Sequence, residues 1–263
     1  MSNRMIMGKY INTGSWMHQL DPRAKTIAML LFMVAVFLVR SSVDLVILAA
    51  YSVAVMATTR ISFRTYARSL RPLLFLMVFI FVFHVLFDTG GSWYVDLGPV
   101  KFYSGGLQKG FLSVSRMVLF VAFTAVLTLT TPPLLLTQAL ESLMKPLALV
   151  GLSPRKITLM LTTSLRFIPT VFEEANKILR AQASRGMDLR DQNVLQKAKL
   201  LISLLVPVTV GAIRRASELV DSMEARGYRL HAPRSRFHEL TWGWGDTLLV
   251  GSTALLIGIT QLV

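Results

Sequence analysis

The sequence predicts an all-α, multi-pass integral membrane protein with about five transmembrane helices and long amphipathic helices on the cytoplasmic side. Composition is the first observation: 53% of the 263 residues are hydrophobic and only 16% are charged, whereas a soluble domain carries about 25% charged residues. The apolar residues also form long blocks, which is typical of membrane spans. Finally, a long basic stretch, Pro132–Leu240, contains apolar residues at helical spacing.

Five apolar segments are candidate spans: Thr26–Val39, Val43–Thr59, Pro72–Phe87, Leu107–Thr131 and Trp242–Val263. A full span needs about 20 residues. The first three are shorter, so they require tilt, flanking residues or local thinning of the bilayer. This pattern divides the chain into a membrane region with four spans at residues 1–131, a cytoplasmic or interfacial region at residues 132–241, and a C-terminal transmembrane helix at residues 242–263.

Two charged residues fall inside these spans. Arg116 lies in the fourth span. It can pair with a carbonyl or an acid nearby, or it can extend towards the membrane surface, and both interpretations stay open. Asp246 lies in the fifth span, close enough to its start to reach the interface.

The charges of the loops predict the orientation. The loop "RISFRTYARSLR" holds four arginines and no acid, and their spacing of three or four residues fits a short interfacial helix. The loop after Phe87 carries two acids and several aromatic residues, as an outer interface does. The positive-inside rule then places the N-terminus, the arginine loop and residues 132–241 in the cytoplasm, and five spans leave the C-terminus outside. The first 25 residues lack signal-peptide features, so we expect a retained cytoplasmic tail.

Composition and missing motifs exclude several classes of function. The net charge of +14 follows from the concentration of Lys and Arg on one membrane side, so it does not indicate nucleic-acid binding. The chain has no cysteine, hence no thiolate nucleophile and no Cys metal site. It contains no P-loop, no H-E-x-x-H and no G-x-S-x-G motif, and its four histidines are scattered. We therefore expect no catalytic residues, no bound metal and no cofactor in this chain.

The basic region is too long for an ordinary loop, and its apolar runs could be spans, a soluble domain or amphipathic helices. Periodicity favours the third interpretation, because apolar and polar residues form two opposite stripes. The apolar stripe consists of Ile157, Leu161, Leu165, Ile168, Phe172, Ala175 and Leu179. Pro169 lies within this pattern, so we expect it to kink or split the helix. A second run, Leu195 to Ala225, behaves similarly and carries Pro207.

Both runs end alike. "ANKILRAQASRGMDL", beginning at Ala175, aligns with "ASELVDSMEARGYRL", beginning at Ala216, at a constant offset of 41 residues. A glycine just past a helix end, with a cation in the last turn, is ordinary helix termination. Alternatively, each arginine protrudes from a helix tip into an acidic groove of a partner, since Arg suits bidentate pairing. Local physics leaves both interpretations open.

These segments resemble the transmembrane T component of energy-coupling factor transporters, the ABC-type importers for vitamins and trace metals in prokaryotes. The resemblance covers nearly the whole chain. It includes "LDPRAKT" at Leu20–Thr26, the block Thr130–Gly186, and the endings "SRG" and "ARG", which match the two signature motifs of that family. Ser184 stands where the family more often has Ala, and both residues are small.

The resemblance implies a coupling role. Long coupling helices would dock on two homologous P-loop ATPases, which bind ATP-Mg, through Ser184, Arg185 and Gly186 and through Ala225, Arg226 and Gly227. A small membrane protein, the substrate-binding S component, would contact the residues Ile157, Leu161, Leu165, Ile168, Phe172, Leu201 and Leu205. The other expected partner is the lipid bilayer. The competing hypotheses are a permease subunit of a conventional ABC importer, a membrane-bound lipid-modifying enzyme and a scaffold without energy coupling.

Overall fold

A computed structural model of the chain describes residues 10–88, 90, 93–96, 101–151, 153–184, 194–229 and 240–262. The chain divides into two compact units. The first unit comprises Met1–Pro154 and Leu240–Val263, and the second comprises Arg155–Glu239. The second unit is therefore inserted in the sequence between two parts of the first.

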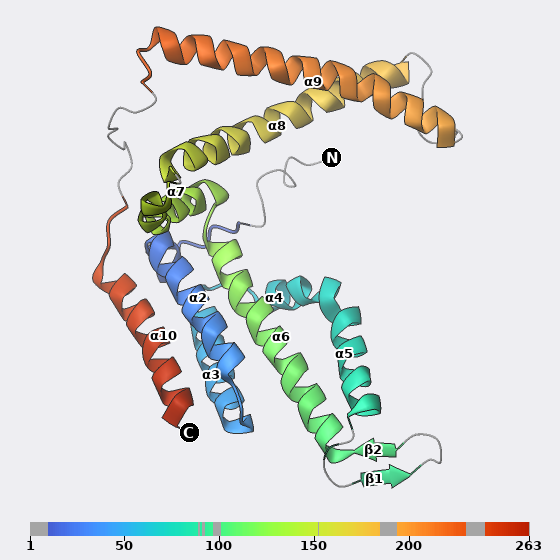
Figure 1. Cartoon of the computed structure of the whole chain (residues 1–263), viewed down its shortest axis with the longest axis vertical. Helices are drawn as coiled ribbons and strands as arrows, with labels where there is room; N and C mark the ends of the chain where they lie inside the picture. The colour runs from blue at the N-terminus through green and yellow to red at the C-terminus, as the bar shows by residue number, and fades with distance from the viewer. Residues whose placement is uncertain are drawn as a thin grey trace. The chain divides into compact units, whose positions relative to one another are not determined.

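The first unit is helical, as the sequence predicts. Its elements are α1 Trp16–Gln19, α2 Pro22–Leu38, α3 Ser42–Thr58, α4 Phe63–Leu70, η2 Arg71–Leu73, α5 Leu74–Phe87, α6 Ser104–Thr130, α7 Pro133–Leu143, η3 Lys145–Val150 and α10 Trp244–Leu262. Helices α2, α3, α5, α6 and α10 run alternately down and up in Figure 1. The bounds of these five helices lie within three residues of the five expected spans, except that α2 begins four residues before the expected Thr26.

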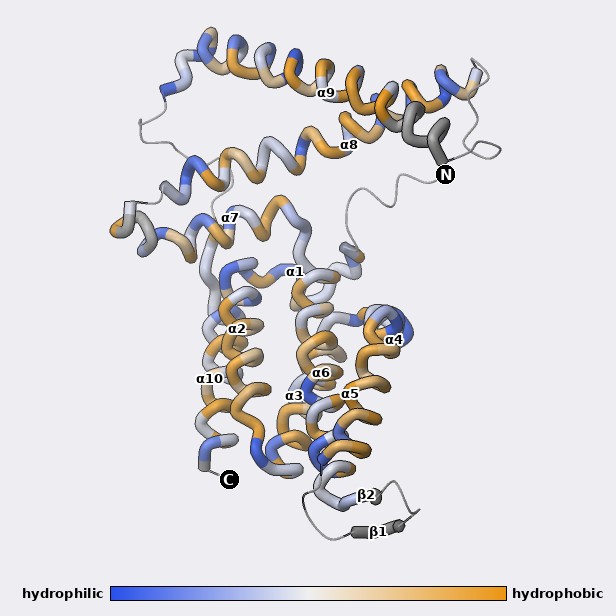
Figure 2. Tube along the Cα trace, turned by 45° about the vertical axis from the view of Figure 1, so that its right-hand side comes forward, coloured by the Kyte–Doolittle hydropathy of each residue, from blue (hydrophilic) through white to orange (hydrophobic). Residues whose placement is uncertain are grey.

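Among the residues that the structure describes, two helical stretches are long and apolar enough to cross a membrane: Phe63–Phe87, with 25 residues, and Ser104–Thr130, with 27. Ser42–Thr58 is apolar but shorter. Figure 2 shows hydrophobic residues along most of α5 and α6, whereas hydrophilic and hydrophobic residues alternate along α8 and α9. The arginine loop forms helix α4, as expected, and continues through η2 into α5.

A two-stranded hairpin interrupts the helical pattern. Strand β1 (Trp93–Asp96) pairs antiparallel with β2 (Lys101–Tyr103), with an irregular register between Trp93 and Val95. The sequence analysis treated this segment as a plain loop. Aromatic and β-branched residues favour extended backbone, so the short runs Trp-Tyr-Val and Lys-Phe-Tyr account for the two strands.

Aromatic stacking marks the core of the first unit. The rings of Phe32 on α2 and Phe123 on α6 stack with centroids 4.0 Å apart, and Tyr51 on α3 stacks on Phe32 at 6.2 Å. The Tyr51 hydroxyl lies 2.7 Å from Thr253 Oγ1 on α10. This hydrogen bond satisfies a polar group within the bundle, so one cluster of side chains joins α2, α3, α6 and α10.

The second unit contains two long helices, α8 (Pro154–Ser184) and α9 (Val194–Ala225). They cross one another in Figure 1. Both helices run unbroken through their internal prolines, Pro169 and Pro207. Of the two outcomes expected at Pro169, a kink or a split, the split does not occur. A proline removes only one backbone donor, and the turns on either side keep their own hydrogen bonds.

Candidate functional site

The second of the two matching endings is a fully formed helix terminus. The N–H of Tyr228 donates to the carbonyl of Met223 at 2.9 Å, and the N–H of Gly227 donates to the carbonyl of Glu224 at 2.8 Å. This pair of bonds is the Schellman motif, which requires a left-handed residue just past the helix. Gly227 supplies it with a φ of +71°. The backbone around Arg226 is thus held in one defined conformation.

Arg226 is the last residue before this left-handed turn. Its N–H donates to the carbonyl of Ser222 at 3.3 Å, while its side chain is exposed. It forms no ion pair with any residue that the structure describes. The carbonyl end of a helix favours a cation. The local structure is therefore compatible with both interpretations, helix termination and docking on a partner. The cap ends the helix, and the guanidinium beside it has no ion-pair partner among the described residues.

The first ending is described only in part. Helix α8 reaches Ser184, whose Oγ donates to the carbonyl of Arg180 at 3.1 Å. Arg185 and Gly186 lie outside the described residues. Ser184 and Ala225, which the sequence aligned, are the last residues of their helices.

Three of the seven residues of the apolar stripe of α8 are exposed, and the other four are half-buried. Its exposed members are Leu161, Ile168 and Phe172, with exposed fractions of 37%, 42% and 55%. Ile157 and Leu165 are half-buried. Side chains this apolar are rarely left in water as a contiguous patch unless they contact a partner or lipid.

Helix α9 carries a second exposed stripe that the sequence analysis identified only at two positions. Leu205 is 65% exposed, and the side chain of Leu201 lies outside the described residues. The further exposed members are Ile202, Val206, Val210 and Ile213. Their spacing of three or four residues in "ISLLVPVTVGAI" was the signal that could have identified them.

An ion pair joins the two long helices. Arg215 Nη2 on α9 lies 2.7 Å from Glu174 Oε2 on α8. This contact was not predicted from the sequence. No hydrophobic or charge pattern within one helix specifies which residue it faces on another.

Arg116, the charged residue within the apolar part of α6, forms a hydrogen bond to α2. Arg116 Nη2 donates to the carbonyl of Val39, the residue that ends α2. Val39 is 1% exposed. Of the two interpretations that the sequence left open, the structure has Arg116 pairing with a carbonyl, which supplies a donor to a backbone group that the end of α2 leaves unsatisfied.

Asp246, at the start of α10, is buried within the first unit. It is 3% exposed. Its Oδ1 accepts the N–H of Asp21 and its Oδ2 accepts the N–H of Gly243, each at 2.7 Å. One carboxylate thus satisfies the backbone at the start of both α2 and α10, which explains why it is buried.

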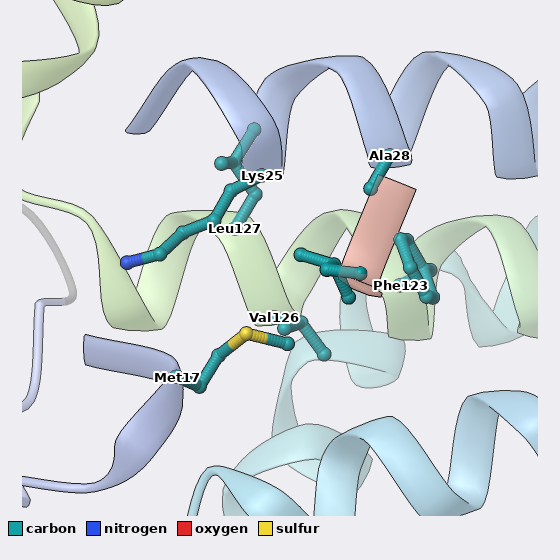
Figure 3. A pocket seen from close by; sticks show the side chains of 7 residues that line it. Met17, Lys25, Ala28, Phe123, Val126 and Leu127 are labelled. Carbon is teal, nitrogen blue, oxygen red and sulfur yellow. The ribbon is translucent and has the colours of Figure 1, made fainter. Parts of the chain in front are cut away.

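A small cavity beside this cluster is too small for an organic substrate. Figure 3 shows its lining, where the Lys25 ammonium points away from Ala28 and Phe123. Its volume is about 10 Å³, which is about the space that one water molecule needs. Among the residues that the structure describes, no group of three or more His, Cys, Asp or Glu side chains could hold a metal ion.

Comparisons with known proteins identify relatives over the full length. A family model described as "Cobalt transport protein" (CbiQ) matches residues 13–238. The energy-coupling factor transporter transmembrane protein EcfT of Listeria innocua is 39% identical over 259 residues, covering 98% of each chain. The protein of the same name from Bacillus subtilis is 37% identical over 259 residues, again covering 98% of each chain. That of Streptococcus thermophilus is 34% identical over 248 residues, covering 94% of each chain.

Proposed function

This chain belongs to the family of transmembrane T components of energy-coupling factor transporters, and from that premise we propose that it transmits ATP-driven motion from two ATPases to a substrate-binding S component. The chain is an all-α, multi-pass membrane protein and a non-catalytic transporter subunit. As a T component it works with ATPase and S component partners. The finer assignment of surfaces and topology is our proposal.

The observation that carries the proposal is the pair of matching helix ends. Each P-loop ATPase accepts one tip: Ser184, Arg185 and Gly186 in one subunit, and Ala225, Arg226 and Gly227 in its homologue. Arg226 supports this assignment, because its side chain is exposed and has no ion-pair partner among the described residues. The cap also fixes the backbone that carries it, so that part of the chain loses little freedom on binding. ATP-Mg is bound by the ATPases.

The S component binds the exposed apolar stripes. The residues that we assign to this contact are Ile157, Leu161, Leu165, Ile168, Phe172, Leu201 and Leu205. The exposure of the described members supports the assignment, since a large uncovered apolar patch marks an interaction surface. The substrate that the S component delivers is a vitamin or another micronutrient.

The proposed topology follows the loop charges. The N-terminus and residues 132–241 lie in the cytoplasm, and the C-terminus lies outside the bacterial cell membrane. The alternating direction of α2, α3, α5, α6 and α10 supports five crossings. The ends of α2 and α5, the start of α6 and the C-terminus lie at the same end of the first unit (Figure 1), as an outer face requires.

The test reverses both tip charges. Arg185→Glu combined with Arg226→Glu should lower recovery of the ATPases on purification in mild detergent by roughly tenfold or more, and should abolish uptake with membrane insertion intact. The matched control, Arg166→Glu with Arg214→Glu, makes the same change in charge at exposed positions away from the tips and should retain the ATPases. Retention of active ATPases by the tip variant would refute the docking assignment.

A further inference from the structure

The ion pair between α8 and α9 occupies equivalent positions in the two matching segments. Glu174 and Arg215 are separated by the same 41 residues as Ser184 and Ala225. Each lies ten residues before the end of its helix. At a rise of 1.5 Å per residue, both tips are therefore about 15 Å along the helix from the ion pair. The ion pair therefore lies at the same distance from the two helix tips.

Gly211, one turn before Arg215, has no side chain that would obstruct this contact. A Cβ at this glycine would lie 2.7 Å from Glu174 Oε1 and 3.2 Å from its Cδ. Any residue other than glycine would therefore displace the Glu174 carboxylate. Gly211 is unfavourable in a helix interior on conformational grounds, so its presence here is explained by the close approach of the carboxylate.

The pair is also partly shielded from solvent. The exposed fractions of the Arg215 and Glu174 side chains are 31% and 26%. Their neighbours in sequence, Glu173 and Arg214, are exposed and form no ion pair in the described part of the chain. Partial burial strengthens the attraction between two charges relative to a fully solvated pair, so this contact differs from ordinary surface charges on the same helices.

We propose that Glu174 and Arg215 are positioning residues that pin the crossing of α8 and α9, so that the two helices turn about this point when the ATPases move. This inference rests on the proposed docking of the helix tips. The pinned crossing converts a displacement of either tip into rotation of a helix. Without it, one helix slides past the other and the motion of the ATPases is lost before it reaches the apolar stripes.

The experiment measures the separation of the two tips in the complete transporter. The chain has no cysteine, so Ala181→Cys and Ser222→Cys, at equivalent exposed positions about one turn before the docking residues, can each carry a spin label, attached before assembly with the partners. Electron double-resonance distances are recorded with and without a non-hydrolysable ATP analogue. The unaltered pair should give narrow distance distributions that shift with nucleotide.

Two single variants break the pair. Glu174→Gln and Arg215→Gln should keep the ATPases bound, but should broaden the distances and reduce the nucleotide-dependent shift by about three- to tenfold, the range for residues that carry coupling. Gly211→Ala should act in the same direction. The adjacent variants Glu173→Gln and Arg214→Gln are matched controls and should behave as the unaltered chain does.

The charge exchange Glu174→Arg with Arg215→Glu separates a pin from a merely structural role. The charge-exchanged chain should again give narrow distance distributions and the nucleotide-dependent shift. A chain that had lost its fold would regain neither. The proposal would be refuted if the single variants kept the full nucleotide-dependent shift, or if the charge-exchanged chain recovered neither the narrow distances nor the shift. Loss of the ATPases from the chain with unaltered tips would instead refute the proposed function, so the two failures are distinguishable.

Discussion

The side chain of Asp246 bridges the starts of two helices that are 225 residues apart in sequence, accepting the N–H of Asp21 at 2.7 Å. Asp21 in turn caps α2 by accepting the N–H of Arg23 at 2.8 Å. The first turn of α2 therefore depends on a residue of α10. This gives a structural role to the "LDPRAK" segment, whose resemblance to the family was evident from sequence without a reason for it.

Replacing Asp246 should destabilise the first unit. Asp246→Ala leaves the buried N–H of Asp21 without a partner, at about 1–3 kcal/mol, and removes the acceptor of the more exposed Gly243 N–H; Asp246→Asn retains one acceptor and should cost less. The midpoint of thermal unfolding in detergent measures the effect. Asp221→Asn, at an exposed acid of α9, is the control. Equal midpoints for all three variants would contradict the bridge.

Replacing Gly227 should loosen the tip of α9. Gly227→Ala meets no atom within 4 Å, so its cost comes from the φ of +71°, about 1–2 kcal/mol. Hydrogen exchange of residues 222–228 should accelerate, and ATPase binding should weaken. Gly251→Ala, an equally open position inside α10 without positive φ, should leave exchange there equal or slower. Unchanged exchange at the tip of Gly227→Ala would argue against the cap.

Removing the charge within α6 should release the end of α2. Arg116→Met takes the donor from the Val39 carbonyl, which is buried, at about 1–3 kcal/mol. Arg116→Lys, with a shorter single donor group, should be intermediate. Reversible unfolding in mixed micelles measures the difference. Arg71→Met removes an exposed arginine and should have no effect, so a shift of the same size there would refute the assignment.

The link between α5 and α6 should weaken in acid. The hydrogen bond from Lys109 Nζ, 3.0 Å from Asp88 Oδ1, and that from the N–H of Gly90 lower the pKa of Asp88 below its usual value. A lowered pKa stabilises the folded form above the unfolded pKa near about 4, and this stabilisation is lost as pH falls through the folded value. Hydrogen exchange near residues 84–110, corrected for intrinsic rate, should therefore increase below about pH 4.

The variant Asp88→Asn is the test of this pH dependence. It should show the faster exchange already at neutral pH and no further titration from this group. Asp96→Asn changes another acid of the same segment and serves as its control. An Asp88→Asn protein that still titrates as the unaltered chain does would assign the acid sensitivity to another group.

The proposed topology can be tested with single cysteines, because the chain has none of its own. Ser41→Cys, between α2 and α3, and Gln261→Cys, near the C-terminus, should react with a membrane-impermeant maleimide in intact cells. Ser62→Cys, before α4, should react only after the cells are opened. Labelling of Gln261→Cys exclusively in opened cells would remove the fifth crossing.

Much of the helical fold was predictable from the sequence, because each helix is encoded by its own composition. Long apolar blocks predicted α5 and α6, and arginine spacing predicted α4. The hairpin was missed because its strands are only four and three residues long, too short for alternation to be distinguished from a loop.

The contacts between helices were not predictable in the same way. The partners of Asp246 are backbone N–H groups, whose positions no side-chain pattern reveals. The Glu174–Arg215 pair was equally hidden, although both residues lie beside the aligned repeat. For the site, the motif predicted where the helices end, while the Schellman turn at Gly227 explains why the arginine is held there.

The bridge from Asp246 to Asp21 also bears on biogenesis. During synthesis, α2 emerges more than two hundred residues before the carboxylate that completes its first turn. Until α10 is made, the N–H of Asp21 and the α2 surface that packs against α10 lack their final partners. A chain truncated before Leu240 would lack both partners, so α10 is the element that completes the start of α2 and covers its packing surface.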